Sequence, residues 1–287
     1  MRFSVVTPSF NQLDWLELCI ASVADQRQVE LVEHIVCDGG SAGIKDFETR
    51  MLARFPTTQN YRLQFIVGPD TGMYDAINKG LRAAKGDVCS YLNCDEQLLP
   101  AALSTVSEYF LRHEKTDVVF GDTIVVSRDG EAFCYWRPYV PSLRHLAGAS
   151  LNTLSCATFF RHDLVKDGHF FEPKWKTVGD LRWITGLLEK GRSMRCLHAP
   201  LAAFTFLGEN LGASAMAHEE SQASRQQWGP VRCAFRRVLH GLRKLASGAY
   251  VRRSVTYDLF ALSDPSVRRR FYSASLGWTW PGSVKSR

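Results

Sequence analysis

The chain alternates short apolar runs with segments whose apolar residues recur at helical spacing. The apolar runs predict buried strands at 3–6, 34–37, 63–67 and 88–92. The helical pattern predicts helices at 13–26, 73–84, 101–111 and 181–189. Further strands are expected at 117–127, broken at Gly121-Asp122, at 133–136 and at 196–206. Strands that alternate with helices predict an α/β fold with a doubly wound, mostly parallel sheet flanked by helices.

The ends of the first four predicted strands carry polar and turn-forming residues. Thr7-Pro8-Ser9-Phe10-Asn11 follows the first strand, which Pro8 is expected to stop. The next three ends are Asp38-Gly39-Gly40-Ser41, Gly68-Pro69-Asp70 and Asn93-Cys94-Asp95-Glu96. Because ligands of open α/β sheets bind outside the carboxyl ends of the strands, these segments predict one shared cleft.

Two acids in this predicted cleft have chemistry suited to a nucleotide. Asp95 is placed to hold a divalent metal, which can in turn hold phosphates. Asp38 can accept hydrogen bonds from a base or a ribose, and the glycines after it allow the backbone to approach a ligand closely. The structural alternatives are a solvated turn acid at Asp95 and an acid that serves only the Gly-Gly turn at Asp38.

The charge of the chain is unevenly distributed. The net charge is +6, but residues 231–287 hold 12 Lys and Arg against 2 Asp and Glu, so the remainder is mildly acidic. Apolar and charged fractions of 45% and 22% are ordinary for a soluble globular protein, so only the tail is unusual. A strongly basic tail predicts contact with an anionic surface, either a membrane or a nucleic acid.

The basic tail begins with a stretch that has two opposite faces at helical spacing. One arc holds Val231, Phe235, Val238, Leu242 and Leu245, and the other holds Arg232, Arg236, Arg237, Arg243 and Lys244. This pattern predicts a basic amphipathic helix, which either packs its apolar face on the main domain or lies on a membrane surface. Nucleic acid is disfavoured as a partner because aromatic residues are not interleaved with the arginines.

The eight cysteines are scattered and form no CxxC pair, which argues against a disulfide framework or a zinc site. They favour a reducing compartment. The first twelve residues turn polar too early for a signal peptide, and no apolar run is long enough to span a bilayer. We therefore expect a cytoplasmic protein, peripheral on the inner face of the cell membrane through 231–253.

The motifs, taken in order, resemble those of glycosyltransferase family 2, which has the GT-A fold. The resemblance rests on TPSFN at 7–11, DGGS at 38–41, DTGMYDAINKG at 70–80, LNCDE at 92–96 and GDLRW at 179–183. It implies an inverting enzyme of the polysaccharide- and glycolipid-assembly branch. Such an enzyme would move a sugar from a nucleotide-diphospho-sugar, with UDP as the expected nucleotide, to a hydroxyl of a saccharide or lipid-linked acceptor. Mg²⁺ or Mn²⁺ would assist.

The resemblance also implies roles for individual residues. Asp95 would be the metal ligand, and Asp180 the base that deprotonates the acceptor hydroxyl, although a first-turn acid at a helix start also explains Asp180. Asn93 replaces the first acid of the usual DxD motif, and Ser155-Cys156 stands where relatives often have His-Gln. The implied donor-binding residues are Thr7, Pro8, Ser9, Asn11, Asp38, Asp70, Gly72, Asn78, Asn93 and Asp95.

The expected organisation is a GT-A domain at 1–220 and a basic amphipathic helical extension at 221–287. Residues 1–100 would form the nucleotide-binding half and 101–220 the acceptor half. The QxxRW signature of processive synthases is missing, which favours addition of a single sugar. Two alternatives remain: a catalytically degenerate GT-A scaffold, and a nucleotidyltransferase on a related fold. The second would need a Gly-rich phosphate loop with a Lys, which TPSFN lacks.

Overall fold

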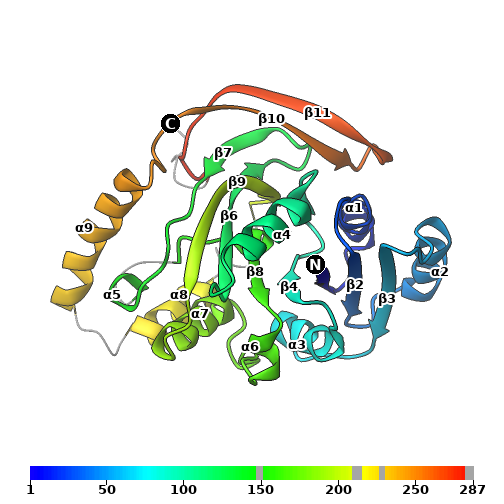
Figure 1. The fold of residues 1–287 in the computed structure, drawn as a ribbon, viewed down its shortest axis with the longest axis horizontal. Coiled ribbons are helices and arrows are strands. Elements are labelled where there is room, and N and C mark those ends of the chain that lie inside the picture. The colour runs from blue at the N-terminus through cyan, green and yellow to red at the C-terminus, as the bar shows by residue number, and fades with distance from the viewer. Residues whose placement is uncertain (147–150, 209–214, 226–229, 282–287) are drawn as a thin grey trace.

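The core of the molecule is one mixed β-sheet. A computed structural model describes residues 1–146, 151–208, 215–225 and 230–281. The strand order is β3-β2-β1-β4-β8-β6-β9-β5, with β7 paired to β6 (Figure 1). The strands are β1 Arg2–Ser9, β2 Leu31–Asp38, β3 Tyr61–Val67, β4 Val88–Tyr91, β5 Gln97–Leu98, β6 Val118–Val126, β7 Ala132–Trp136, β8 Thr158–Arg161 and β9 Met194–Thr205.

Helices cover both faces of this sheet. Alternate residues of a strand point to opposite faces, so Val5 belongs to a hydrophobic cluster with residues of α1, α2 and α4, whereas Val6 belongs to one with residues of α3, α6 and α7. The helices of these two layers are α1 Leu13–Ala24, α2 Ile44–Arg54, α3 Met73–Ala83, α4 Ala102–Arg112, α6 Asp163–Lys166 and α7 Gly179–Glu189. The short helices α5 Leu143–Leu146 and η1 Ser155–Ala157 lie in connections. The predicted doubly wound α/β architecture is confirmed.

The parallel half of the sheet aligns the predicted strand ends. β1 pairs in parallel with both β2 and β4, and β2 pairs in parallel with β3. Ser9 lies opposite Asp38, and Asp38 opposite Val67, so three strands end level with one another. Because β4 runs in the same direction, the segment 93–96 emerges at the same edge, as the shared cleft requires.

Two strand predictions are wrong in detail. β1 does not stop before Pro8 but continues to Ser9 alongside β2. Proline is tolerated because β4 pairs only with Phe3–Val6, so one side of β1 has no ladder to interrupt beyond Val6. β6 is also unbroken at Gly121-Asp122, because β8 and β7 pair with it on either side of that point, and only its register against β9 shifts there.

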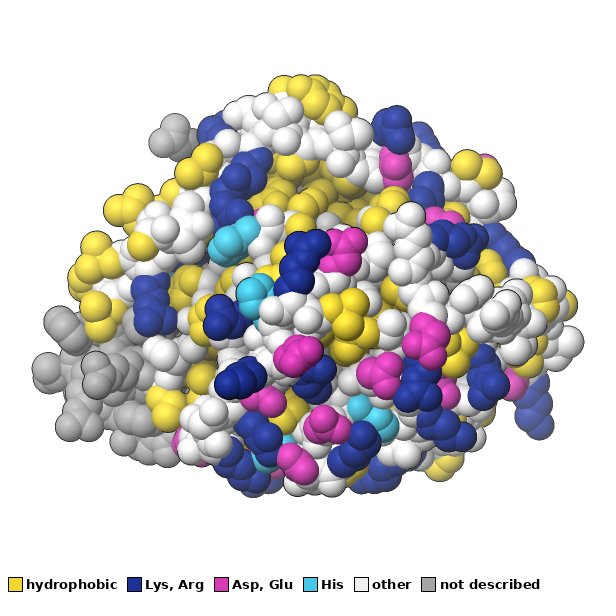
Figure 2. All heavy atoms as spheres, viewed as in Figure 1, with side chains coloured by type: hydrophobic (Ala, Val, Ile, Leu, Met, Phe, Trp, Pro, Cys, Tyr) yellow, Lys and Arg dark blue, Asp and Glu magenta, His cyan; other side chains and the backbone are white. Residues whose placement is uncertain are grey.

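The C-terminal extension contains more than helices. α8 (Ala215–Arg225) spans the predicted boundary at 220, and α9 (Pro230–Ala246) is the predicted basic helix. Beyond it, β10 (Arg253–Ala261) and β11 (Asp264–Leu276) form an antiparallel ribbon that arches over β7 and β9, so the helical prediction is wrong for 253–276 (Figure 1). Figure 2 shows mixed charges over much of this face of the molecule and hydrophobic side chains along the edge where α9 lies.

The ribbon forms because alternate side chains of β10 face the body. Tyr257 and Leu259 pack against Ile124, Tyr135 and other apolar residues of the main sheet. The segment from β10 to β11 is rich in arginine, a composition that predicts a solvent-exposed segment. Its inward-facing side chains nevertheless complete a hydrophobic cluster. The ribbon is therefore part of the folded body.

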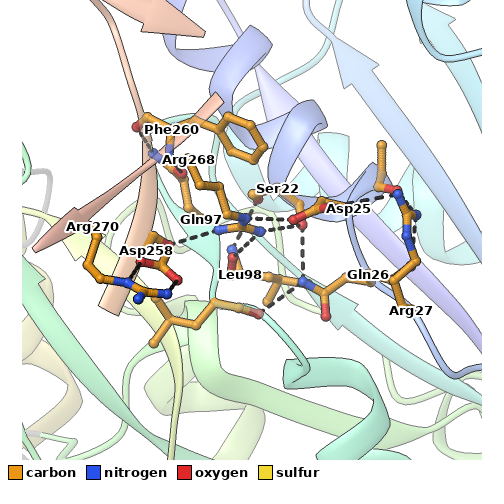
Figure 3. A network of polar contacts seen from close by, with 12 residues as sticks. Ser22, Asp25, Gln26, Arg27, Gln97, Leu98, Asp258, Phe260, Arg268 and Arg270 are labelled. Atoms are coloured by element: carbon orange, nitrogen blue, oxygen red, sulfur yellow. Dashed lines mark hydrogen bonds and ion pairs between the residues drawn. The ribbon is translucent and has the colours of Figure 1, made fainter. Parts of the chain in front are cut away.

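Arg268 of β11 fastens this ribbon to the main domain (Figure 3). Its Nε donates to Asp25 Oδ2 at 2.7 Å, and its other nitrogens donate to the backbone carbonyls of Ser22, Leu98 and Asp258. Its side chain is 11% exposed, so these charge-assisted hydrogen bonds are largely shielded from water. Arg268 thus connects α1, β5 and β10.

We expect Arg268→Ala to lower the free energy of unfolding by about 2 kcal/mol, because Asp25 and the carbonyls lose their shared donor. The measurement is urea denaturation. The matched control is Arg270→Ala, since Arg270 pairs with Asp258 while its side chain is 76% exposed. An exposed pair contributes little, so the control should leave stability close to that of the wild type. Equal losses in the two variants would contradict the anchoring role.

Candidate active site

The ends of β1, β2 and β3 meet around Gly39. A Cβ at this position would lie 2.9 Å from Asp70 Oδ2 and 3.1 Å from the Phe10 ring, so a larger residue would displace these side chains. Phe10 is 61% exposed at this edge of the sheet. The structure therefore brings together the predicted segments 7–11, 38–41 and 70–72.

The carboxylate of Asp38 serves the turn that follows it. Oδ1 accepts hydrogen bonds from the backbone N–H groups of Gly40 and Ser41 at 2.9 and 2.6 Å, and Oδ2 accepts one from the Ser41 hydroxyl at 2.7 Å. The side chain is buried. Asp38 therefore stabilises the Gly-Gly turn, as the structural alternative expects. A contact with a nucleotide base would use lone pairs of the carboxylate that these three hydrogen bonds leave free.

The side chains of the TPSFN segment differ in accessibility. Thr7 is buried, with its hydroxyl 2.9 Å from His34 Nε2, because the strand continues through it. Burial lowers the pKa of His34 to about 3, so this histidine is neutral. Pro8 is also buried, whereas Asn11 is exposed, and the buried Ser9 hydroxyl has no hydrogen-bond partner among the described residues.

The turn at Asp70 is contacted from the acceptor half of the domain. Asp70 Oδ1 accepts a hydrogen bond from Gly72 N at 2.9 Å. Lys176 Nζ donates to Thr71 O at 2.5 Å and would lie 3.7 Å from a Cβ at Gly72. A cation therefore stands beside this turn, a contribution that the sequence pattern did not single out.

Asp95 and Glu96 form a pair of acids after β4, in which Glu96 is buried and Asp95 is partly exposed. Glu96 points inward, where its carboxylate accepts hydrogen bonds from Asn93 N at 2.8 Å and from the Ser155 hydroxyl at 3.2 Å. Burial raises the pKa of both acids, and the negative charge of Asp95 raises the pKa of Glu96 further. No Lys, Arg or His of the described residues forms an ion pair with either acid.

These residues fit a divalent cation. A hard cation prefers oxygen ligands, and it would supply the positive charge that the pair of acids lacks. The Asn93 Oδ1 atom is buried without a hydrogen-bond partner among the described residues, so it offers a further oxygen at this point. Within the described ranges, no three or more His, Cys, Asp or Glu side chains gather as a complete metal site, so the substrate's phosphates would have to complete the coordination.

Asp180 lies in the first turn of α7, where Tyr74 of α3 holds it. Asp180 Oδ1 accepts the Leu181 N–H at 2.7 Å and the Tyr74 hydroxyl at 3.5 Å, while Asp180 N donates to that hydroxyl oxygen at 3.1 Å. Burial raises the pKa of Asp180, which strengthens it as a base. A Cβ at Gly179 would lie 2.5 Å from the Tyr74 ring, so glycine is needed for this close packing.

Glu220 of α8 clamps the segment that leads into α7. Its carboxylate accepts hydrogen bonds from the backbone N–H groups of Lys176, Thr177 and Val178 and from the Thr177 hydroxyl. Burial opposes ionisation, but these donors outweigh it and lower the pKa of Glu220. Glu220 therefore fixes both Lys176 and the approach to Asp180.

Two further predicted positions have local partners. Both polar groups of Asn78 bond to the backbone of Phe171, at 2.8 and 3.0 Å, and the side chain is buried. Asn78 thus tethers α3 to the segment before α7, and its predicted donor contact stays a prediction. Cys156, next to Ser155, is buried with its sulfur 3.9 Å from the Thr123 hydroxyl.

The parallel strand ends, the adjoining mixed half of the sheet and the acids at its edge define the GT-A class of glycosyltransferases. The profile of "Glycosyl transferase family 2" matches residues 4–162, and the chain belongs to this family. A "PGL/p-HBAD biosynthesis glycosyltransferase" of Mycobacterium bovis BCG is 35% identical over 136 residues, 46% of this chain and 51% of that protein. The match thus spans about half the length of this relative.

Other relatives extend the comparison to most of the chain. An uncharacterised glycosyltransferase of Nostoc sp. PCC 7120 is 25% identical over 80% of this chain and 72% of its own. The structure of Staphylococcus aureus TarS 1–349 in complex with UDP-GlcNAc is similar with a TM-score of 0.59, 19% identity, and coverage of 78% and 64% of the two chains. The mannosyltransferase PcManGT of Pyrobaculum calidifontis, in complex with GDP-Man and Mn²⁺, has a TM-score of 0.59 at 17% identity, covering 85% and 69%.

Over the ranges that the structure describes, every helix is too short or too polar to cross a bilayer.

Proposed function

We propose that this family 2 glycosyltransferase transfers one sugar, with inversion, from a nucleotide-diphospho-sugar to an acceptor hydroxyl. The observation that supports it most is the placement of a partly buried Asp180, whose pKa is raised, in a domain whose parallel strand ends carry the acids Asp38, Asp70 and Asp95. UDP is the proposed nucleotide, in keeping with the UDP-GlcNAc complex of TarS. The family assignment itself rests on the profile match.

The donor would lie across the strand ends. Phe10 offers an exposed ring to the base, and the turn at 38–41 presents its backbone close by. Asp70 and Gly72 would flank the ribose and diphosphate, where Lys176 adds positive charge. Ser9 and Asn93 contribute polar atoms that have no hydrogen-bond partner among the described residues, and Asn11 is exposed. The buried Thr7 and Pro8 would support this side of the donor site from the core.

Asp95 would hold a divalent metal, Mg²⁺ or Mn²⁺. A bound metal offsets the negative charge that develops on the leaving diphosphate. The protein's own part is to keep Asp95 oriented: Glu96 turns away into its bonds with Asn93 N and Ser155, and Thr205 donates its hydroxyl to the Asp95 carbonyl at 2.5 Å. The PcManGT complex contains Mn²⁺, which agrees with this proposal.

Asp180 would act as the general base. As the acceptor oxygen forms its bond to the anomeric carbon, the bond from that carbon to the diphosphate breaks and the hydroxyl proton passes to Asp180. Attack from the face opposite the leaving group inverts the anomeric centre. The Tyr74 hydroxyl and the Leu181 N–H hold the carboxylate in place, so it is oriented before the acceptor binds.

The acceptor is proposed to be a saccharide or a lipid-linked molecule of polysaccharide or glycolipid assembly. The mycobacterial relative is named for PGL/p-HBAD biosynthesis, which agrees with a role in such assembly. A lipid-linked acceptor would bring the enzyme to the cytoplasmic face of the cell membrane as a peripheral protein. Single addition, without processivity, is proposed from the missing QxxRW signature.

The test is a thermal-shift panel of nucleotide-sugars with and without Mn²⁺, followed by a transfer assay with the stabilising donor. A donor that binds only the folded state raises the melting temperature, so the panel identifies base and sugar together. Stabilisation without hydrolysis or transfer would favour the alternative of a degenerate binding subunit. Absence of stabilisation by every nucleotide-sugar would overturn the proposal.

Glu220 supplies a prediction about positioning. We expect Glu220→Gln to lower kcat about tenfold with little change in the donor KM, because the loosened segment 176–178 misplaces Asp180 during the reaction. Steady-state kinetics measure both constants. Glu219→Gln on the same helix is the matched control, since Glu219 is exposed. Equal kinetics for both variants would show that the clamp does not affect catalysis.

A further inference from the structure

The helix α9 turns its apolar side outward, unlike an ordinary surface helix of a soluble protein. Val238, Leu242 and Leu245 are 63%, 57% and 64% exposed, whereas a surface helix normally turns its apolar stripe to the core. Hydrophobic side chains cover the corresponding edge of the molecule (Figure 2). For the described side chains, the expectation that this arc packs on the main domain is therefore wrong.

Polar side chains of α9 face the body instead. His240 hydrogen-bonds to the Tyr139 hydroxyl. Lys244 Nζ lies 4.6 Å from the centre of the Trp136 ring and 5.9 Å from that of Trp278, so it is held by aromatic faces. Burial lowers the pKa of Lys244. These contacts fix the rotation of the helix about its own axis and leave the apolar arc outward.

The apolar surface continues beyond the helix. An open groove of about 710 Å³ beside α9 is lined by apolar side chains that include Leu143, Leu188, Leu239 and Leu242. Val251, just after the helix, is 55% exposed. Leu242 belongs both to the exposed arc of α9 and to the groove, and exposed apolar surface of this kind is uncommon in monomeric soluble proteins.

The charge around this surface indicates what covers it. The sequence 230–246 holds five basic residues and no acidic one. Among the described side chains, Lys244 faces the body, whereas Arg243 and the following Arg252 are exposed. A second copy of this chain would bring two such basic helices together, which like-charge repulsion opposes. An anionic lipid surface supplies both the apolar phase and the opposite charge, and Lys and Arg flanking an apolar helix face are typical of interfacial helices.

We propose that α9 docks on an anionic lipid bilayer, with Val238, Leu242, Leu245 and Val251 inserted among the lipids and the exposed Arg243 and Arg252 at the headgroups. The proposed function enters only as the reason for docking, which would bring the active site to a lipid-linked acceptor. The physical basis for docking is the exposed apolar arc and its basic surroundings, and docking can be measured without any transfer reaction.

The experiment is sedimentation of the full-length protein with vesicles of phosphatidylcholine containing 30% phosphatidylserine, compared with phosphatidylcholine alone. We expect binding to the anionic vesicles that weakens at high salt. Leu242→Ser/Leu245→Ser should lower the vesicle partition coefficient at least tenfold, because two inserted side chains are lost. Leu111→Ser/Val267→Ser is the matched control, since these side chains are 62% and 60% exposed elsewhere, and it should bind like the wild type.

Other outcomes overturn the proposal. These are the absence of binding to anionic vesicles, equal binding by the two double variants, or a dimer in ultracentrifugation that Leu242→Ser/Leu245→Ser abolishes without any vesicle binding. Donor-induced thermal shift, measured on the same samples, separates this proposal from the enzymatic one: it should be unchanged in Leu242→Ser/Leu245→Ser. Vesicle binding without any donor shift would leave docking supported and the transferase proposal refuted.

Discussion

Asp180→Asn should reduce kcat by roughly 10²–10⁴-fold, the usual contribution of a general base. The amide retains an oxygen that can accept the Leu181 N–H and the Tyr74 hydroxyl, so the fold around α7 should persist. What is lost is the ability to take a proton from the acceptor hydroxyl. Donor binding, measured by thermal shift or calorimetry, should remain close to that of the wild type, because the change acts on the acceptor side.

The pH dependence adds a second test of Asp180. Burial raises the pKa of Asp180, so wild-type kcat/KM should fall as the pH drops through this raised value and the base becomes protonated. Asp163→Asn is the matched control: its carboxylate is 71% exposed on α6 and pairs only with Lys166 within the described residues. Near-normal turnover by purified Asp180→Asn, with this control also normal, would reassign Asp180 to a structural role at the start of α7.

The sequence predicted the frame of the site because its signals are local. Alternation of strands and helices, together with the turn residues that end each strand, was enough to align Asp38, Asp70 and Asp95 at one edge of a sheet. Strand pairing, rather than local sequence, determined where β1 ends. β1 continues through Pro8, and this places Thr7 inside the core beside His34, where a run of small polar residues had suggested exposure.

Long-range partners could not be predicted from the sequence. Glu220 lies in a polar stretch that resembles a linker, and Tyr74 lies 106 residues before the acid it holds. Arg268 stands in a run of three arginines that indicates a solvated tail, yet it is the buried anchor of the ribbon. In each case the partner groups come from elements distant in sequence, and spacing along one chain segment carries no information about them.

Asp95→Asn should abolish the stabilisation of the protein by Mn²⁺ with donor. For the wild type, a ligand at a hundredfold excess over its Kd adds about 2.7 kcal/mol to the free energy of unfolding, so the loss is readily measured by thermal unfolding. Without metal, the variant should be at least as stable as the wild type at pH 8. Burial raises the pKa of Asp95, so its ionised form destabilises the folded state at pH 8, and asparagine removes that cost.

The sign of the pH effect distinguishes a metal ligand from a turn acid. Because the pKa of Asp95 is raised in the folded state, protonation stabilises the metal-free protein as the pH falls through about 6. The same proton competes with the metal, so the Mn²⁺-dependent shift should be large at pH 8 and small at pH 5. Asp163→Asn should retain this profile. A shift that is independent of pH, or that survives Asp95→Asn, would place the metal elsewhere and leave Asp95 as an acid of the turn after β4.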